Sequence, residues 1–348
     1  MKSPLFPTGG EGRDLWTAAL PAPYEKPLMK VYRSIAEAAG GALRGGAVAI
    51  GNFDGVHHGH QALLRAAREQ AGRRGRAAGA LTFDPHPVRV LRPGLAPPIL
   101  TPLVRKLELL GELGLDATVV QPFTLEWAAT SAAEFVERDL AGLLGVADVV
   151  VGWDFTAGHE RARVDVLRPL LAARGVALHV VEPVTSDGLV VSSTKIREFL
   201  LEGKVEAAAM LLSRPYDVDG VVEHGAGRGR GFGFATANVE TQGLLPANGV
   251  YVVRAFVGGG GDGFERAAFH GGVCNIGVKP TVEAGARVSA EAHLFDFDGR
   301  DLYGEPIRVA FLSRLRDERR FDSVDALKAQ IAADADRARR YLAAVEGP

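Results

Sequence analysis

The stretch AVAIGNFDGVHHGH at residues 47–60 joins a short apolar run to a turn rich in glycine and histidine. The run AVAI, bounded by glycines, predicts a buried β-strand. Apolar residues at helical spacing follow in HQALLRAAREQA at 60–71 and predict a helix. Gly51, Gly55 and Gly59 let the backbone of the turn approach a ligand closely. A strand, a glycine turn and a helix in this order predict the first unit of an α/β domain.

The same alternation continues on both sides of this unit. Apolar runs predict further strands at 77–83, 117–123, 148–152 and 177–184, and helical patterns lie at 103–113, 131–144 and 164–173. Ser131 and Glu134 have capping-box spacing, which predicts a helix start. The alternation predicts a Rossmann-like parallel sheet covered by helices on both faces.

After residue 214 the pattern changes. Short valine-rich segments separated by turn residues lie at 217–225, 249–257, 266–277, 288–299 and 306–313. They predict an antiparallel barrel or sandwich, of which we favour a β-barrel, and the pattern at 323–345 predicts a long C-terminal helix.

Glycine marks the boundary between the two patterns. The chain has 43 glycines, and 17 of them fall between Gly220 and Gly285. We therefore predict a loosely ordered extension at 1–28, an α/β domain at 29–211 and a β-barrel domain at 212–348. Whether translation starts at Met1 or Met29 stays open.

Composition excludes several classes of protein. The 348 residues are 47% hydrophobic and 24% charged, which excludes wholesale disorder. A formal net charge of −2 disfavours nucleic-acid binding. No run of 18 apolar residues predicts a membrane span, and the single cysteine, Cys274, predicts a reducing cytoplasm. Composition leaves the choice between monomer and homo-oligomer open.

His57 and His60 are three residues apart at the predicted helix start, so we expect their imidazoles to face the same way. Backbone N–H groups of the helix start would add positive potential for phosphate oxygens. The pair could stabilise a pentacovalent phosphorus and a departing pyrophosphate. The alternatives are surface histidines or part of a metal site, for which Asp84 and His86 are candidate third ligands.

A second phosphate-binding segment is VSSTKIREFL at 191–200. It places Ser193 and Thr194 at a predicted helix N-terminus and Arg197 just inside, a combination that suits a triphosphate. The alternative is an ordinary helix cap.

The motifs GNFDGVHHGH, LTFDPHP, VVGWDF and SSTKIR, in this order, resemble the adenylyltransferase module of the prokaryotic bifunctional riboflavin kinase/FAD synthetases, members of the HxGH nucleotidyltransferases. The resemblance implies that the phosphate of FMN attacks the α-phosphorus of ATP and releases pyrophosphate. It implies catalytic roles for His57, His60 and Arg197. It also implies an ATP- and flavin-binding set of Gly51, Asn52, Phe53, Asp54, Gly55, Asp154, Ser193 and Thr194.

The glycine block GAGRGRGFGFATAN at 225–238 suits backbone wrapped around phosphates, although a flexible linker is the alternative. Thr236 and Asn238 point to the same face of an extended segment and offer neutral oxygens to a Mg²⁺ that carries ATP phosphates. Glu291 lies within a predicted strand among apolar residues, where a carboxylate needs either an ion-pair partner or a role as general base.

This block, together with LPANGVY at 245–251, NIGVKPT at 275–281, EAH at 291–293 and DLYG at 301–304, resembles the riboflavin kinase module of the same family. The resemblance implies Mg²⁺ held with ATP by Thr236 and Asn238, and activation of the ribityl 5′-hydroxyl of riboflavin by Glu291. The predicted phosphate cradle is Gly227, Arg228, Gly229, Arg230 and Gly233. The predicted function is conversion of riboflavin to FMN and of FMN to FAD, each with ATP.

Four residues depart from the family pattern. Ala157 replaces an aromatic residue, Arg163 a glycine, Ala235 the proline before Thr-Ala-Asn, and Ser213 a glycine in LLSRPY between the modules. Two alternatives therefore remain: one module has decayed, leaving a monofunctional kinase or adenylyltransferase, or the chain is a non-catalytic flavin- or nucleotide-binding regulator.

Overall fold

The computed structural model describes residues 29–223, 235–258, 264, 269–280, 286–297 and 301–346. Its contacts divide the chain into two compact units, one ending at Glu198 and the other beginning at Phe199. The domain boundary at residue 212 stays a prediction, and the extension at 1–28 lies outside the described residues.

The N-terminal unit is built on a six-stranded parallel sheet with the strand order β1-β4-β3-β2-β5-β6. This confirms the predicted parallel sheet. The edge strand β1 was not expected from the sequence, because three residues are too few to show a period. The strands are β1 (Lys30–Tyr32), β2 (Ala47–Ile50), β3 (Ala78–Asp84), β4 (Ala117–Pro122), β5 (Asp148–Gly152) and β6 (Ala177–Val181).

The helices of this unit follow the strands along the chain. They are α1 (His58–Arg73), α2 (Pro87–Leu91), the 3₁₀ turn η1 (Pro93–Leu95), α3 (Leu103–Glu112), α4 (Leu125–Ala128), α5 (Ala132–Glu134), the π-helix η2 (Phe135–Leu144), α6 (Val164–Ala172) and α7 (Ser193–Leu201). The capping box of Ser131 and Glu134 is present at the start of α5. The helix expected at 131–144 changes after Glu134 from an α-helix to the π-helix η2. Its buried positions recur about every four residues, a spacing that does not distinguish the two helix types.

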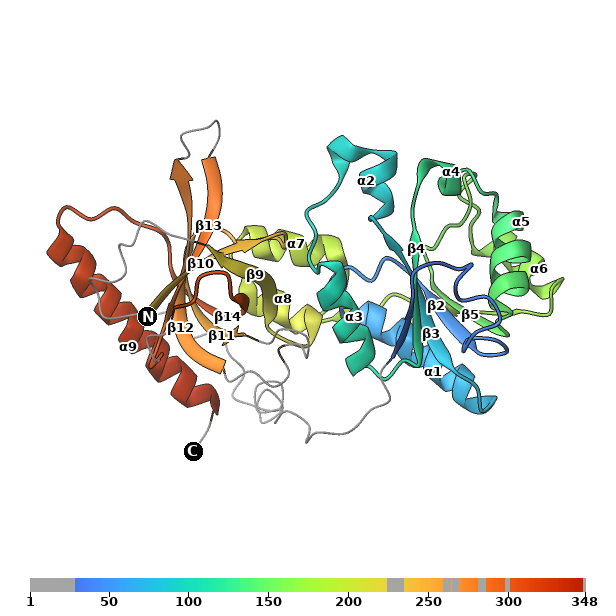
Figure 1. The fold of residues 1–348 in the computed structure, drawn as a ribbon, viewed down its shortest axis with the longest axis horizontal. Coiled ribbons are helices and arrows are strands. Elements are labelled where there is room, and N and C mark those ends of the chain that lie inside the picture. The colour runs from blue at the N-terminus through green and yellow to red at the C-terminus, as the bar shows by residue number, and fades with distance from the viewer. Residues whose placement is uncertain are drawn as a thin grey trace. The chain divides into compact units, whose positions relative to one another are not determined.

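Alternate residues of the strands build two cores, one on each face of the sheet. On one face Val48, Leu81 and Val149 pack with η2 and α6. On the other, the small side chains of Ala47, Ala49, Ala78 and Ala80 lie in the cluster that includes α1 and Leu109 and Leu110 of α3. Because alanine occupies little space, α1 can pack closely against this face, which confirms that helices cover both sides (Figure 1).

The C-terminal unit contains a closed six-stranded antiparallel barrel with the order β10-β13-β12-β11-β14-β9, which decides between the barrel and the sandwich. Its strands are β9 (Tyr216–Glu223), β10 (Ala235–Thr241), β11 (Gly249–Val257), β12 (Phe269–Pro280), β13 (Ala286–Leu294) and β14 (Pro306–Arg316). Two further helices are α8 (Val205–Leu212) and α9 (Val324–Glu346). The long helix α9 confirms the prediction for 323–345 and packs outside the barrel on β11, β12 and β14 (Figure 1).

A two-stranded hairpin of β7 (Thr185–Ser186) and β8 (Leu189–Val190) precedes α7 and was also missed. Its turn residues Asp187 and Gly188 both have positive φ, at 48° and 77°. An Asp-Gly pair is a strong signal for such a turn, so the sequence does carry the information.

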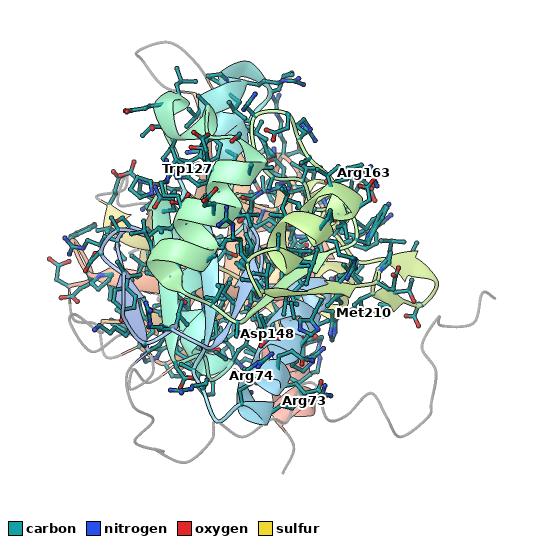
Figure 2. The ribbon with its side chains drawn as sticks, turned by 90° about the vertical axis from the view of Figure 1, so that its right-hand side faces the viewer. Arg73, Arg74, Trp127, Asp148, Arg163 and Met210 are labelled. Carbon is teal, nitrogen blue, oxygen red and sulfur yellow. The ribbon has the colours of Figure 1, made fainter. Side chains whose placement is uncertain are left out.

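A buried carboxylate at the start of β5 links this strand to β6 and to the residue that follows α1. The side chain of Asp148 is 3% exposed and accepts hydrogen bonds from the guanidinium of Arg74 and, at 2.8 Å, from Nε2 of His179. Burial alone would raise the pKa of Asp148, but these two hydrogen bonds lower it below its usual value. Arg73, the last residue of α1, instead pairs with the exposed Glu69. Figure 2 labels Asp148, Arg74 and Arg73.

We expect Asp148→Asn to lower the free energy of unfolding by about 1–3 kcal/mol at pH 7, because the buried hydrogen bonds lose their charge. Because the folded state lowers the pKa of Asp148, this contribution is present above the unfolded pKa of about 3.9 and is lost as pH falls through the lower, folded value. Urea titrations of both proteins at pH 7 and pH 3 measure it.

The matched controls come from the C-terminal end of α1 and its cap residue. Arg74→Ala should destabilise in the same direction as Asp148→Asn but by less, and Arg73→Ala should leave the midpoint unchanged. Equal effects of the two arginine substitutions would contradict the assignment.

Candidate active sites

A cavity of about 1010 Å³ lies in the N-terminal unit at the carboxyl ends of the parallel strands. Residues at or beyond the ends of β2, β3, β4, β5 and β6 contribute to its wall. The chain runs from β2 outward to β3 on one side and later to β5 on the other, so the strand order reverses beside β2. Ligands of open α/β sheets bind at such reversal points.

The two histidines of the turn lie together at the start of α1. His57 is the N-cap residue, and its Nδ1 accepts a hydrogen bond from the backbone N–H of His60 at 3.3 Å. The two rings stack with centroids 3.7 Å apart and an interplanar angle of 14°. The N-cap geometry, in which His57 faces the third residue of α1, therefore brings the imidazoles side by side in the wall of the cavity, and the expectation that the two rings face the same way is confirmed.

Nδ1 of His60 is buried and has no hydrogen-bond partner among the described residues. Burial lowers the pKa of His60 well below its usual value, and the nearby His57 and Lys106 lower it further. Lys106, in α3, is itself buried, which lowers its pKa, while Asp54 and Asp84 partly oppose that shift. Lys106 was not predicted from the sequence to belong to the site.

The turn that carries the histidines is strained. Phe53 and Val56 have positive φ angles of 49° and 44°, which cost energy for residues with a side chain, most of all for a β-branched one. Phe53 is completely buried, and the edge of its ring contacts His60 at a centroid distance of 5.3 Å. The packing of Phe53 thus holds His60 in place from behind.

Asp54 joins three segments of the wall. Its buried carboxylate accepts hydrogen bonds from the backbone N–H groups of Leu100 and Thr101, at 2.9 Å for Thr101, and from the guanidinium of Arg197. Its backbone carbonyl accepts a hydrogen bond from Oγ of Ser193 at 2.7 Å. The turn after β2, the segment before α3 and the start of α7 are therefore held by one residue.

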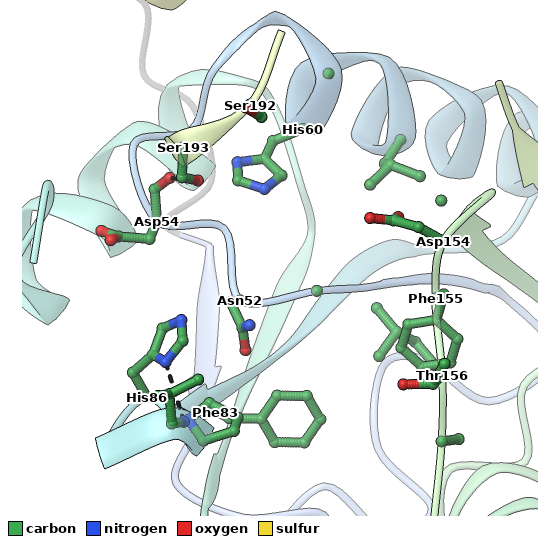
Figure 3. A pocket seen from close by; sticks show the side chains of 18 of the residues that line it. Asn52, Asp54, His60, Phe83, His86, Asp154, Phe155, Thr156, Ser192 and Ser193 are labelled. Carbon is green, nitrogen blue, oxygen red and sulfur yellow. Dashed lines mark hydrogen bonds between the residues drawn. The ribbon is translucent and has the colours of Figure 1, made fainter. Parts of the chain in front are cut away.

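Most of the predicted nucleotide residues line this cavity. The set that the structure brings together is Gly51, Asn52, Asp54, His57, His60, Asp154, Ser193, Thr194 and Arg197. Figure 3 shows His60 and Ser193 on one side, Asp154 opposite, and Asn52 below His60. Phe53 and Gly55 do not line the cavity. Phe53 is instead buried and contacts the ring of His60, which does line the cavity.

An aromatic wall completes the cavity. Phe83, Phe123, Trp127 and Phe135 contact one another with centroid distances of 5.2–5.9 Å, and all four line the cavity. None of the four was predicted from the sequence to belong to the site. Phe83 lies in LTFDPHP at the end of β3 and Phe123 just beyond β4, and that position at strand ends was the available signal.

Two of the family departures lie in the segment that leads from β5 to α6. Ala157 is buried and forms an isolated antiparallel bridge with Ala162, so the loop is closed by two backbone hydrogen bonds of 3.0 and 2.8 Å. Arg163 is the N-cap residue of α6 with φ −84° and ψ 176°. That backbone conformation suits any residue, so arginine in place of glycine adds no strain there.

The metal alternative for the histidines gains no support. No group of three or more potential ligands forms a metal site within the described parts of the chain. His86 instead accepts a hydrogen bond at Nδ1 from the N–H of Val88 and so caps α2 (Figure 3). Burial also lowers the pKa of His86.

The barrel carries a second polar cluster across β10, β13 and β12. Glu291 lies in register between Asn238 of β10 and Asn275 of β12. Alternate residues on these strands, among them Ala237 and Ala292, are fully buried inside the barrel. The three polar side chains therefore share the outer face, and Thr236 and Asn238 lie on the same side of β10, as predicted.

The next row on this face contains Thr236, His293 and Val273 in register. Oγ1 of Thr236 and Nδ1 of His293 are 2.9 Å apart, within hydrogen-bond distance. Burial lowers the pKa of His293, and the nearby Glu291 partly opposes this shift. Cys274 points into the barrel, where burial raises the pKa of its thiol.

Part of the predicted kinase site lies outside the described residues. These positions are Gly227, Arg228, Gly229, Arg230 and Gly233. Ala235, the third departure from the family, begins β10 and is paired with Leu294.

Comparison with known proteins agrees with the two-part architecture. A family model described as FAD synthetase matches residues 41–195, and one described as riboflavin kinase matches residues 212–342. A bifunctional riboflavin kinase/FMN adenylyltransferase from Pseudomonas fluorescens is 39% identical over 302 residues, which cover 86% of this chain and 94% of the relative. The protein of the same name from Escherichia coli K12 is 36% identical and covers 90% and 98%.

A crystal structure described as a macrolide-efflux protein from Streptococcus pneumoniae superposes with a TM-score of 0.78 at 29% identity, covering 90% of this chain and 99% of that chain. Within the part of this chain that the structure describes, no helix is both long and apolar enough to cross a membrane. Both family models fall on the units found here, and the curated relatives span nearly the whole chain. The chain therefore belongs to the family of bifunctional riboflavin kinase/FMN adenylyltransferases.

Proposed function

We propose that the cavity of the N-terminal unit transfers an adenylyl group from ATP to FMN, and that the outer face of β10, β13 and β12 phosphorylates riboflavin with ATP. The observation that carries the first assignment is the stacked pair of His57 and His60, which lines the same cavity as the N-terminus of α7. The chain thus performs two consecutive transfers, riboflavin to FMN and FMN to FAD.

In the first site the chain binds and stabilises phosphate. The N-terminus of α7 offers backbone N–H groups, the hydroxyl of Thr194 and the guanidinium of Arg197 to the β- and γ-phosphates of ATP. A phosphate oxygen of FMN attacks the α-phosphorus, the bond to the β-phosphate oxygen breaks, and pyrophosphate leaves. His57 and His60 donate hydrogen bonds to the oxygens on which negative charge grows.

The aromatic wall suits the flavin ring. A flat, largely apolar ring system gains burial and edge or face contacts against Phe83, Phe123 and Trp127, roughly 0.5–1.5 kcal/mol for each aromatic pair beyond the buried area. Asp154 lies across the cavity from His60, where it can contact the polar part of either substrate (Figure 3).

In the barrel site, Glu291 is the proposed general base. It accepts the proton of the ribityl 5′-hydroxyl, whose oxygen attacks the γ-phosphorus of ATP while ADP leaves. Thr236 and Asn238 present two neutral oxygens beside Glu291, a donor set that fits a Mg²⁺ already bound to phosphates. That Mg²⁺ would neutralise phosphate charge during the transfer.

We further propose that the protein is cytoplasmic and binds no nucleic acid. The single cysteine and the net charge of −2 support these two points.

The two sites can be tested against each other. Glu291→Gln should lower FMN formation by about 10²–10⁴-fold, because the amide cannot take the proton, and should leave FAD formation from supplied FMN unchanged. The double substitution His57→Asn and His60→Asn should lower FAD formation from supplied FMN and leave FMN formation unchanged. Chromatography of the flavins after incubation with ATP and Mg²⁺ separates the products.

The same experiment decides between the alternatives. Accumulation of FMN without FAD by the unaltered protein would show a decayed adenylyltransferase, and absence of both products would show a non-catalytic binder. Loss of both reactions in Glu291→Gln would contradict the division into two sites.

The state of His60 predicts a pH profile for FAD formation. Because burial holds its pKa well below 6.5, the ring is neutral at pH 7 and donates as a neutral imidazole. We expect kcat/KM for ATP with FMN to stay within about twofold between pH 6.5 and 8.5, measured as pyrophosphate release, since kcat/KM reports groups of the free enzyme. A tenfold fall per pH unit across this range would mean that the charged imidazolium is required.

A further inference from the structure

His293 lies within hydrogen-bond distance of Thr236 but has no role in the proposed kinase reaction. It lies beside the kinase cluster, in register with Thr236 on β10 and with Val273 on β12. Its Nδ1 is 2.9 Å from Oγ1 of Thr236, whereas Val273 on the other side is apolar and packs in the cluster under α9. Within its row, Thr236 is the neighbour that offers this ring a polar group.

The direction of this hydrogen bond affects what Thr236 can do. A threonine hydroxyl has one proton to donate and two lone pairs that accept. If the proton goes to Nδ1, both lone pairs stay free for a cation, and the side chain stays in one of its staggered rotamers. If Nδ1–H donates instead, one lone pair is used and the hydroxyl proton must point elsewhere.

We propose that His293 is a positioning residue for the kinase site. Its Nδ1 accepts a hydrogen bond from the hydroxyl of Thr236 and so directs the lone pairs of Oγ1 to the Mg²⁺ and phosphates of bound ATP. The proposal rests on the proposed function of Thr236 as a ligand. Glu291, two residues earlier on the same strand, takes the substrate proton, so base and positioning residue occupy adjacent rows of one face.

Two amide substitutions separate a hydrogen-bonding role from a packing role. In His293→Asn the amide oxygen can occupy the place of Nδ1, whereas in His293→Gln the amide lies one bond further out. We expect His293→Gln and His293→Leu to lower FMN formation at limiting Mg²⁺ by about 10–100-fold and to raise the Mg²⁺ concentration for half-maximal rate, as is usual for residues that orient a ligand. His293→Asn should stay within about threefold of the unaltered protein.

The binding step gives a readout besides activity. Calorimetric titration of the full chain with ADP at several Mg²⁺ concentrations should show a component that Thr236→Val removes. His293→Leu and His293→Gln should weaken the same component by a similar factor, and His293→Asn should keep it.

A double-mutant cycle tests whether His293 acts through Thr236. In the Thr236→Val background, His293→Leu should cause no further loss of FMN formation. FAD formation from supplied FMN, which takes place in the N-terminal unit, serves as a control for the fold of that unit. If His293→Leu does not yield folded protein, the comparison of His293→Asn with His293→Gln still decides.

The outcomes distinguish the ligand role of Thr236 from the positioning role of His293. Unimpaired FMN formation in Thr236→Val would overturn the proposed role of Thr236, and the positioning role with it. Impairment by Thr236→Val together with equal behaviour of His293→Asn and His293→Gln, or additive losses in the cycle, would overturn the positioning role alone.

Discussion

The N-terminal site depends on the buried carboxylate of Asp54. Removing a carboxylate from water costs several kcal/mol, so it must be fully hydrogen-bonded, and here its partners are the backbone of Leu100 and Thr101 and the guanidinium of Arg197. Each partner comes from a different part of the chain than the turn after β2. The need to satisfy one charge therefore brings together the turn with the histidines, the segment before α3 and the start of α7. Arg197 is oriented by this pair as well as by the carbonyl of Pro98, so that its remaining donors can face the cavity.

The barrel site is organised differently. Thr236, Asn238, Glu291 and Asn275 need no central charge to meet, because strand register alone places them in adjacent rows. Strand alternation then sends their side chains outward and sends Ala237, Ala292 and Cys274 inward. A slip of one residue between β10 and β13 would exchange the two sets, so the packed interior of the barrel also fixes the chemistry on its surface.

What the sequence could predict follows from how local each feature is. The stacking of His57 and His60 requires only the local geometry of a helix start, and the face shared by Thr236 and Asn238 requires only strand alternation. Asp54 was expected near the nucleotide, but its hydrogen bonds reach amides 46 and 47 residues away, which no local pattern encodes. The aromatic wall draws Phe83, Phe123 and Trp127 from separate segments, and the pairing of His293 with Thr236 needs the register of two strands. Strand β1 was missed because it is short.

These two designs differ in how far a local change spreads. In the N-terminal unit the loss of one carboxylate would remove the hydrogen bonds to the segment before α3 and to Arg197 at once, and would leave the half-buried guanidinium of Arg197 without its carboxylate partner, so geometry and charge would fail together. In the barrel the backbone of each polar residue is held by its own strand pairing, so the loss of one side chain leaves the ladder intact. Thr236 combines both kinds of support, since its backbone is fixed by the ladder and its hydroxyl lies within hydrogen-bond distance of His293. Strand register fixes the backbone of a threonine but leaves its hydroxyl free to rotate. A site that must direct one lone pair of that hydroxyl accurately therefore needs a second side chain to hold it.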